Sequence, residues 1–216
     1  MKRFLMSLIA LTCCGLGCTP ERTDVFIQSV VIPKADPVLH TCKFESSDPT
    51  RAKVNGVINV GAQKDLNGGL LSAYYGFQVE NTVITPPSQT PPGSAGNTAN
   101  RDDAIFKGLD IVATEDSTNQ VLVTETIPAS GYANHAGGIG VAVGDIIGKK
   151  LQDALLARST NFGMHLGVKV KGSFVAGSDF ETGEYSFPMQ VIYGGGVIAP
   201  TDGGPTIIPL GATNCE

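Results

Sequence analysis

The chain has 216 residues, of which 15 are Lys or Arg, 20 are Asp or Glu and 3 are His, and its formal net charge is −5. This mild acidity, without any cluster of Lys or Arg, excludes the charge pattern of a nucleic-acid-binding protein and of a domain that docks electrostatically on anionic lipid. The length suits one domain with room for an inserted loop and a tail.

The N-terminal stretch has the layout of a secretory signal. Lys2 and Arg3 form a basic start, residues 4–11 form an apolar core, and residues 15–17 are small residues that end at Cys18. We expect residues 1–17 to be absent from the mature protein, because such signals are removed. The apolar core is much shorter than the roughly 20 residues of a membrane-spanning helix.

The same stretch resembles a bacterial lipoprotein signal, with Cys18 as the lipidated first residue and residues 18–24 as a short tether. Such signals usually carry Leu three residues before the cysteine, where this chain has Gly15. A secreted protein without lipid and an uncleaved anchor are the alternatives. Thr19 after the cysteine resembles the default pattern for the outer membrane of a Gram-negative bacterium. The resemblance implies attachment to the membrane through acyl chains.

Two cysteines remain once the signal is removed and Cys18 is modified. They are Cys42 and Cys215, one near each end of the mature chain. In an exported protein such a pair favours a structural disulfide, and closing a loop of about 170 residues would contribute about 4–5 kcal/mol in the loop-entropy model. A reactive thiol or half of a metal site is the alternative.

The first half of the mature chain predicts strands. Residues 25–32 are rich in β-branched residues and stop at Pro33, and residues 40–44 form a short candidate strand around Cys42. Residues 53–60 and 73–84 alternate apolar and polar positions, which indicates strands with one buried face. The expected buried residues are Val54, Ile58, Val60, Tyr75, Phe77, Val79 and Val83.

Residues 85–100 contain four prolines among Gly, Ser and Asn, which predicts a flexible surface loop. A proline-rich ligand is the alternative, but the stretch lacks a basic flank. Residues 104–113 and 121–127 then predict a hairpin. Helical spacing follows and predicts one amphipathic helix of about four turns, with Asp145 in its first turn and an apolar stripe over one end of the sheet or against a partner. The stripe consists of Val143, Ile147, Leu151, Ala154 and Leu155.

Two alternating segments, residues 162–176 and 184–193, predict the closing strands. Pro188 places the second at a sheet edge, where a missing N–H is tolerated. The outward residues expected in the first segment are His165, Lys169, Lys171 and Ser173. Residues 194–216 form a Gly/Pro-rich tail. Together the pattern predicts a mainly β domain over residues 25–193, an antiparallel β-sandwich with one amphipathic helix.

A family resemblance follows from particular motifs. Residues 77–81 (FQVEN) resemble the strand ending in V-x-N of LEA14/WHy-type domains, and the hairpin, the helix, residues 168–172 (VKVKG) and Phe187-Pro188 follow in the same order. The resemblance covers residues 53–193 and implies an immunoglobulin-like sandwich without an enzymatic site. The layout also resembles lipoproteins of myxobacteria and their relatives, whose last strand carries a cysteine motif that residues 192–196 lack.

No motif predicts a catalytic residue, a metal or a cofactor. The three histidines are His40, His135 and His165, and only His40 has a cysteine nearby, whereas a zinc site needs three or four ligands. Residues 137–150 depart from a phosphate-binding loop because Lys149 is followed by Lys150 instead of Ser or Thr. The acidic runs 101–103 and 179–184 lack the spacing of a calcium loop and are expected to be solvated turns.

We therefore expect an exported, lipid-anchored protein of the cell envelope that serves as a non-catalytic binding or structural module. Its partners would be the membrane, through the N-terminal lipid, and an envelope protein. The binding surface would be loops at one end of the sandwich or an exposed strand edge. A carrier of an apolar ligand between the two sheets and an enzyme are the alternatives.

Overall fold

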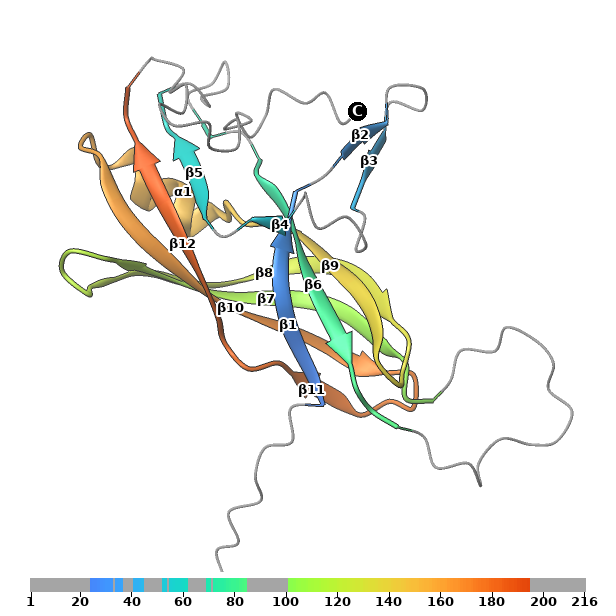
Figure 1. Cartoon of the computed structure of the whole chain (residues 1–216). Helices are drawn as coiled ribbons and strands as arrows, with labels where there is room; N and C mark the ends of the chain where they lie inside the picture. The colour runs from blue at the N-terminus through green and yellow to red at the C-terminus, as the bar shows by residue number, and fades with distance from the viewer. Residues whose placement is uncertain are drawn as a thin grey trace, which may run out of the picture.

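A computed structural model describes residues 24–32, 34–36, 41–44, 52–53, 55–61, 69–70, 72–84 and 101–194. Within these ranges the protein is mainly β with a single short helix, which confirms the predicted class (Figure 1). The elements are β1 (Val25–Val31), β2 (Lys34–Asp36), β3 (Thr41–Lys43), β4 (Ala52–Lys53), β5 (Gly56–Asn59), β6 (Tyr74–Asn81), β7 (Ala104–Glu115), β8 (Val121–Ala133), β9 (Gly138–Asp145), α1 (Lys149–Leu156), β10 (Phe162–Phe174), β11 (Asp179–Glu181) and β12 (Tyr185–Ile192). The predicted loop 85–100 lies outside the described residues.

Ten of the strands join in one curled sheet. Their order is β4-β1-β6-β9-β8-β7-β10-β12-β5, and β11 pairs with β10. The β12–β5 pairing is parallel and the other pairings are antiparallel. The curl brings distant strands face to face, because Tyr75 of β6 meets Phe187 of β12 with ring centroids 5.5 Å apart. β2 and β3 form a separate hairpin.

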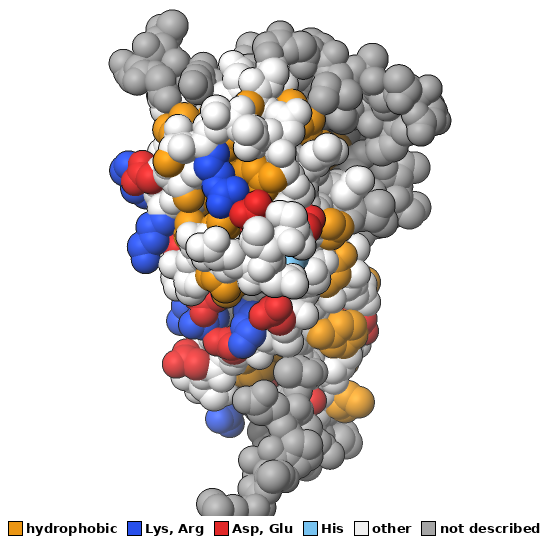
Figure 2. All heavy atoms as spheres, turned by 90° about the vertical axis from the view of Figure 1, so that its left-hand side faces the viewer, with side chains coloured by type: hydrophobic (Ala, Val, Ile, Leu, Met, Phe, Trp, Pro, Cys, Tyr) orange, Lys and Arg blue, Asp and Glu red, His pale blue; other side chains and the backbone are white. Residues whose placement is uncertain are grey.

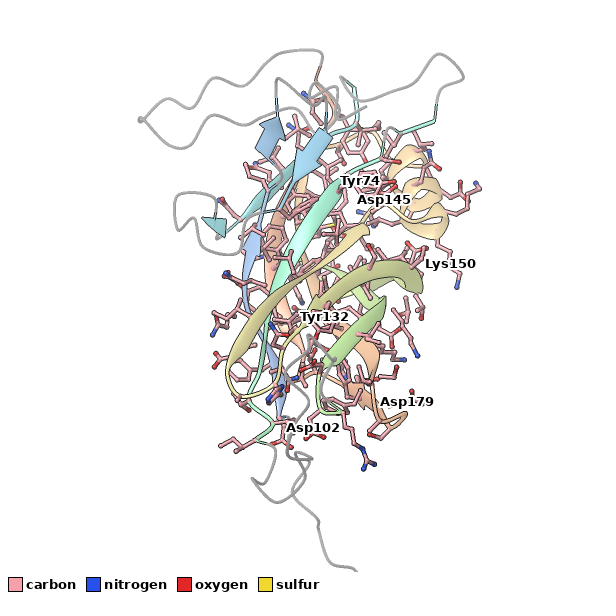
Figure 3. All side chains as sticks on the ribbon, turned by 90° about the vertical axis from the view of Figure 1, so that its right-hand side faces the viewer. Tyr74, Asp102, Tyr132, Asp145, Lys150 and Asp179 are labelled. Atoms are coloured by element: carbon pink, nitrogen blue, oxygen red, sulfur yellow. The ribbon has the colours of Figure 1, made fainter. Side chains whose placement is uncertain are left out.

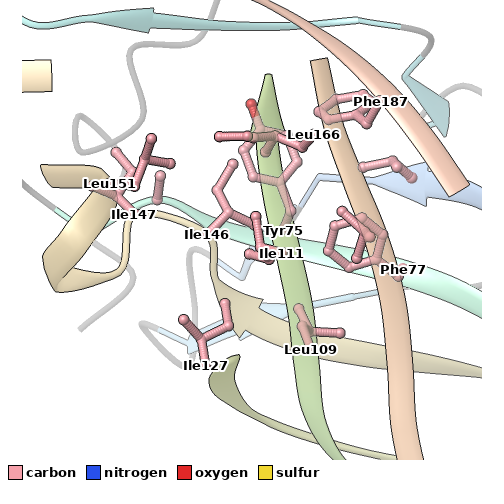
Figure 4. Close-up of a cluster of buried hydrophobic side chains, with 14 of the residues drawn as sticks. Tyr75, Phe77, Leu109, Ile111, Ile127, Ile146, Ile147, Leu151, Leu166 and Phe187 are labelled. Atoms are coloured by element: carbon pink, nitrogen blue, oxygen red, sulfur yellow. The ribbon is translucent and has the colours of Figure 1, made fainter. Parts of the chain in front are cut away.

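The core lies inside this curl (Figure 4). Large side chains from both walls are fully buried, among them Phe77 of β6, Leu109 of β7, Leu166 of β10 and Phe187 of β12. Each such side chain contributes roughly 1.5–3 kcal/mol on burial. The predicted inward positions are confirmed at Ile58, Val60, Tyr75, Phe77 and Val79, whereas Val83 is only half-buried and Val54 lies outside the described residues.

The single strand predicted over residues 53–60 is wrong, because the structure divides it in two. β4 pairs with β1, whereas β5 pairs with β12 at the opposite end of the sheet order. Gly56 begins β5, and a Cβ there would lie 2.9–3.0 Å from side-chain atoms of Met189, Phe187 and Tyr75, so a larger residue would have to displace these core side chains. This short stretch therefore draws the two edges of the sheet together.

The four-turn helix predicted from residue 143 is also wrong. Val143 and Asp145 belong to β9, and α1 has two turns. Glycines 138 and 140 allow β9 to approach β8, since a Cβ at Gly140 would lie 1.9 Å from the carbonyl oxygen of Tyr132. The Asp145 carboxylate accepts hydrogen bonds from backbone N–H groups, one of them from Ala73 at 2.8 Å, so it holds a turn instead of a helix terminus.

The apolar stripe of the helix is confirmed at Leu151 and Leu155, which are buried. The N-terminus of α1 is capped from outside the helix by Glu125 of β8. Its carboxylate accepts the N–H groups of Lys150 at 3.3 Å and Leu151 at 3.2 Å. A carboxylate at this end satisfies donors that lack partners within the helix and complements the helix dipole.

Two smaller expectations need correction. β12 is an edge strand only over its first half, because β5 covers the same side along residues 189–192. Since β5 pairs only with residues 189–192, Pro188 falls just beyond that pairing and its missing N–H removes no bond to β5. Ser173, expected to be exposed, is buried where β10 pairs with Asp179 of β11.

Candidate functional site

Six strand ends converge at one end of the sheet. The register brings the start of β1 against the end of β6 and the start of β9, and the start of β7 against the ends of β8 and β10. We call this the Asp103 end, after a buried aspartate just before β7. Figure 3 shows its neighbour Asp102 at this end, with Tyr74 and Asp145 at the opposite end.

Asp103 ties together the turns of this end. Its side chain is 4% exposed, and Oδ1 accepts the backbone N–H of His135 at 2.9 Å and lies 2.7 Å from His135 Nδ1. The Tyr132 hydroxyl donates to Oδ2, and the Val175 N–H donates to the Asp103 carbonyl oxygen at 2.9 Å. The Asp103 carboxylate therefore joins the start of β7 to the end of β8 and the β8–β9 turn. The backbone carbonyl group of Asp103 holds the turn after β10.

The hydrogen bond to Asp103, together with burial and the negative charge, raises the pKa of Tyr132 to about 12. The phenol therefore stays a neutral donor throughout the physiological pH range, and the contact persists across that range.

Asn81, the last residue of β6, is fully buried beside this cluster. Its Nδ2 donates to the carbonyl oxygen of Asp102 at 2.8 Å, and its Oδ1 accepts the N–H of Val83 at 3.2 Å. The Asn81 carbonyl oxygen also accepts the N–H of Gly137 at 2.8 Å. Asn81 therefore links the end of β6 to two turns that are remote in sequence, one through its side-chain amide and one through its backbone carbonyl, and its buried amide is satisfied by hydrogen bonds.

The hydrogen bonds of this cluster hold the surrounding turns in position. A buried carboxylate that orients an imidazole supplies two of the three members of a nucleophilic triad, which also needs a hydroxyl or thiol beside the second ring nitrogen. The Tyr132 hydroxyl and the backbone and ring of His135 all bind the Asp103 carboxylate, as expected for a carboxylate that anchors the surrounding turns. Across the part of the chain that the structure describes, no group of three or more His, Cys, Asp and Glu is arranged to hold a metal ion.

Large exposed hydrophobic side chains gather around the Asp103 end. Ile84 is the most exposed, at 78%. Ile105 of β7 lies opposite Tyr132 on the neighbouring strand β8. Phe26 of β1 and Ile139 of β9 both lie opposite Glu80 of β6, one on each side of it. We call the set the apolar rim. It consists of Phe26, Ile84, Ile105, Tyr132, Ile139 and Val175. Exposed apolar residues that gather in this way mark contact surfaces, whereas scattered ones do not.

The open strand edges are a less suitable contact surface. Among the described strands, open edges belong to β1 over residues 25–29, to β12 over residues 185–188 and to the short strands β4, β5 and β11, which have two, four and three residues. The β1 edge is interrupted by a bulge between Ile27 and Ser29, and the β12 edge contains Pro188, which has no N–H to donate. Bulges and prolines are the devices by which edge strands resist the addition of another strand.

The charged pairs of β10 with β7 and β11 are partly exposed to solvent. Lys171 pairs with Asp110, and Lys169 lies 2.8 Å from Glu181, whose pKa is lowered by this hydrogen bond. On the face shown in Figure 2, acidic and basic side chains are interspersed. Exposed pairs of this kind contribute about 0–1 kcal/mol each and indicate no ligand.

Three of the cysteines and histidines singled out in the sequence lie outside the described part of the chain. Cys18, His40 and Cys215 do so, and Cys42 is described only by the backbone of β3. Lipidation and the disulfide therefore stay predictions. Within the described ranges, no helix has the length and apolar character needed to cross a bilayer.

The structure corrects one expectation about the acidic turns, because Asp103 is buried and not solvated. Sequence reasoning missed its cluster with Tyr132 and His135, since these residues are about 30 positions apart and no motif links them. The FQVEN motif did include Asn81. No family model, curated protein or solved structure matches the chain.

Proposed function

We propose that the protein is an exported, lipid-anchored module of the bacterial cell envelope, held at Cys18 in the outer membrane, and that it binds without catalysing a reaction. Its contact surface is the apolar rim. The observation that carries this proposal is the gathering of exposed Phe26, Ile84 and Ile139 at one end, together with the other rim residues.

The turns under the rim support a binding role because they are held in place. Asp103 and Asn81 join the segments that carry Tyr132, Ile84 and Val175. A surface ordered before contact loses less side-chain and loop entropy on binding, which makes a small apolar contact more effective.

The alternatives have less support. A carrier of an apolar ligand needs an interior cavity, whereas the space between the walls is occupied by Phe77, Phe187 and their buried neighbours. An enzyme needs a polar group free to act on a substrate, and the Asp103 carboxylate is already engaged by Tyr132 and His135. We also propose that the sheet is an immunoglobulin-like sandwich, with β1-β6-β9 as one layer and β7-β10-β12-β5 as the other.

Photo-crosslinking in intact cells tests the proposal. A benzophenone amino acid would replace Ile84 at the rim or, as the control, Tyr74 at the opposite end of the sheet. Both positions are exposed, at 78% and 52%, so neither replacement disturbs the core. We expect abundant adducts with protein or lipid from position 84 and few from position 74. Equal yields from the two positions would contradict the rim as the contact surface.

The anchor is tested separately with Cys18→Ser. We expect this variant to leave the membrane fraction, since one acyl-bearing residue provides the attachment. Continued membrane association of the variant would refute lipidation at Cys18.

A further inference from the structure

The chain enters the fold at the apolar rim. Asp24 directly precedes β1, and its carbonyl oxygen accepts the backbone N–H of Thr82 at 2.7 Å and the Thr82 hydroxyl at 2.9 Å. Thr82 follows Asn81, the buried residue of the Asp103 end. The tether therefore joins the domain at the end that carries the exposed hydrophobic side chains.

The length of the tether limits how far this end can lie from the anchor. Six peptide units separate Cys18 from Asp24, and an extended chain covers at most about 3.3–3.6 Å per residue, or roughly 20 Å in total. An acylated Cys18 lies at the bilayer surface. The opposite end is farther away, because Tyr74 precedes Ile84 by ten residues of largely extended chain, or about 33 Å.

We propose that the apolar rim docks on the lipid bilayer that holds the acyl chains of Cys18. Ile84, Val175 and the other rim residues enter the interfacial region, and the end with Tyr74 and α1 points away from the membrane. This inference rests on the lipidation proposed above and names the partner of the same surface.

The chemistry of the rim suits a lipid interface. It presents aliphatic side chains together with the rings of Phe26 and Tyr132, and aromatic rings of this kind favour the boundary between headgroups and acyl chains. Tyr132 is 42% exposed while its hydroxyl is bound by Asp103, so the ring can meet lipid without leaving a polar group unpaired.

Attraction to the bilayer is apolar and not electrostatic. The charged residues that flank the rim are of both signs, among them Asp24, Glu80, Arg101 and Lys107. Docking therefore needs no anionic lipid. The tether also makes the contact intramolecular in effect, so even a weak apolar contact is highly populated once Cys18 is inserted.

Single tryptophans provide the test, because the natural sequence contains none. The lipidated full chain would carry Ile84→Trp or Val175→Trp at the rim, or Tyr74→Trp as the matched control. Each protein would be reconstituted into phosphatidylcholine vesicles with and without lipid brominated near the headgroup end of the acyl chain. We expect blue-shifted emission and quenching at least about twofold stronger for both rim variants than for the control, because only buried indoles meet the bromines.

The readouts separate this inference from the proposed function. Flotation of each protein with the vesicles is measured first, and loss of flotation in Cys18→Ser reports the anchor. Proteins that float but show no stronger quenching at position 84 or 175 than at position 74 would overturn the docking orientation and leave the anchor intact. Proteins that do not float would overturn both. Quenching at the rim should also persist at high salt, and its loss there would refute an apolar contact.

Discussion

Replacing Asp103 by Asn should destabilise the protein much more than the same change elsewhere. The substitution keeps the shape of the side chain but removes the charge that accepts hydrogen bonds from Tyr132 and from both the backbone and the ring of His135. The amide nitrogen is itself a donor, so it can no longer accept on that side.

The expected loss of stability combines three weakened hydrogen bonds with a smaller desolvation cost. A hydrogen bond to a charged group contributes about 1.5–3 kcal/mol, against about 0.5–1.5 kcal/mol for a neutral one, so weakening three such bonds costs about 3 kcal/mol. Removing a buried charge returns part of its desolvation cost. We expect a net loss of about 2 kcal/mol for Asp103→Asn, which lowers Tm by about 4–8 °C for a domain of this size.

Urea unfolding at neutral pH measures this loss, with Asp153→Asn as the matched control. Asp153 is exposed and pairs with Lys149 four residues earlier, so its change should cost at most about 0.5 kcal/mol. Amide exchange adds a local readout, because the N–H groups of His135 and Val175 should lose protection first. If the two variants unfold within 0.5 kcal/mol of one another, Asp103 is not the anchor that we describe.

Three further predictions concern the helix cap, the pH dependence of the Tyr132 contact and the disulfide. Glu125→Ala should cost about 1 kcal/mol in thermal unfolding, because it removes the cap from the N–H of Leu151 and its neighbour; an unchanged Tm would show that water replaces the carboxylate. The raised pKa of Tyr132 means that its contribution to stability is complete below about pH 10 and is lost as the pH rises through about 12. Tyr132→Phe should therefore flatten the fall in stability over that window, and an identical pH profile would contradict this. Mass analysis of the mature, unreduced protein should find no free thiol at Cys42 or Cys215, and alkylation of both would refute the disulfide.

Alternation was the reliable sequence signal. It predicted β6 and β10 because their buried residues, such as Phe77 and Leu166, follow the two-residue period of a strand. The helix prediction failed at residues whose apolar spacing fits both a helix and a strand. Val143 fits a helical stripe with Ile147, but glycines in the preceding residues let β9 pack against β8, and that tertiary approach is not visible in the local pattern.

The candidate site could not be predicted from short stretches of sequence, because it also depends on tertiary contacts. Asp103, Tyr132 and His135 meet only because β7 and β8 pair antiparallel over their whole lengths and bring a strand start against a strand end. The exposed residues of the rim, such as Ile84, also carry no sequence signature. A single exposed isoleucine resembles a buried one until the fold shows which neighbours cover it.

The position of β5 has a consequence for how the chain folds. Gly56 pairs with Met189, about 130 residues later, and contacts of such separation slow folding because a large loop must be closed first. In a chain synthesised from its N-terminus, β5 has no partner strand until β12 has been made. The curl therefore closes only after nearly all of the described strands are available. Until then β5 stays unpaired, and the arrival of β12 limits when the curl can close.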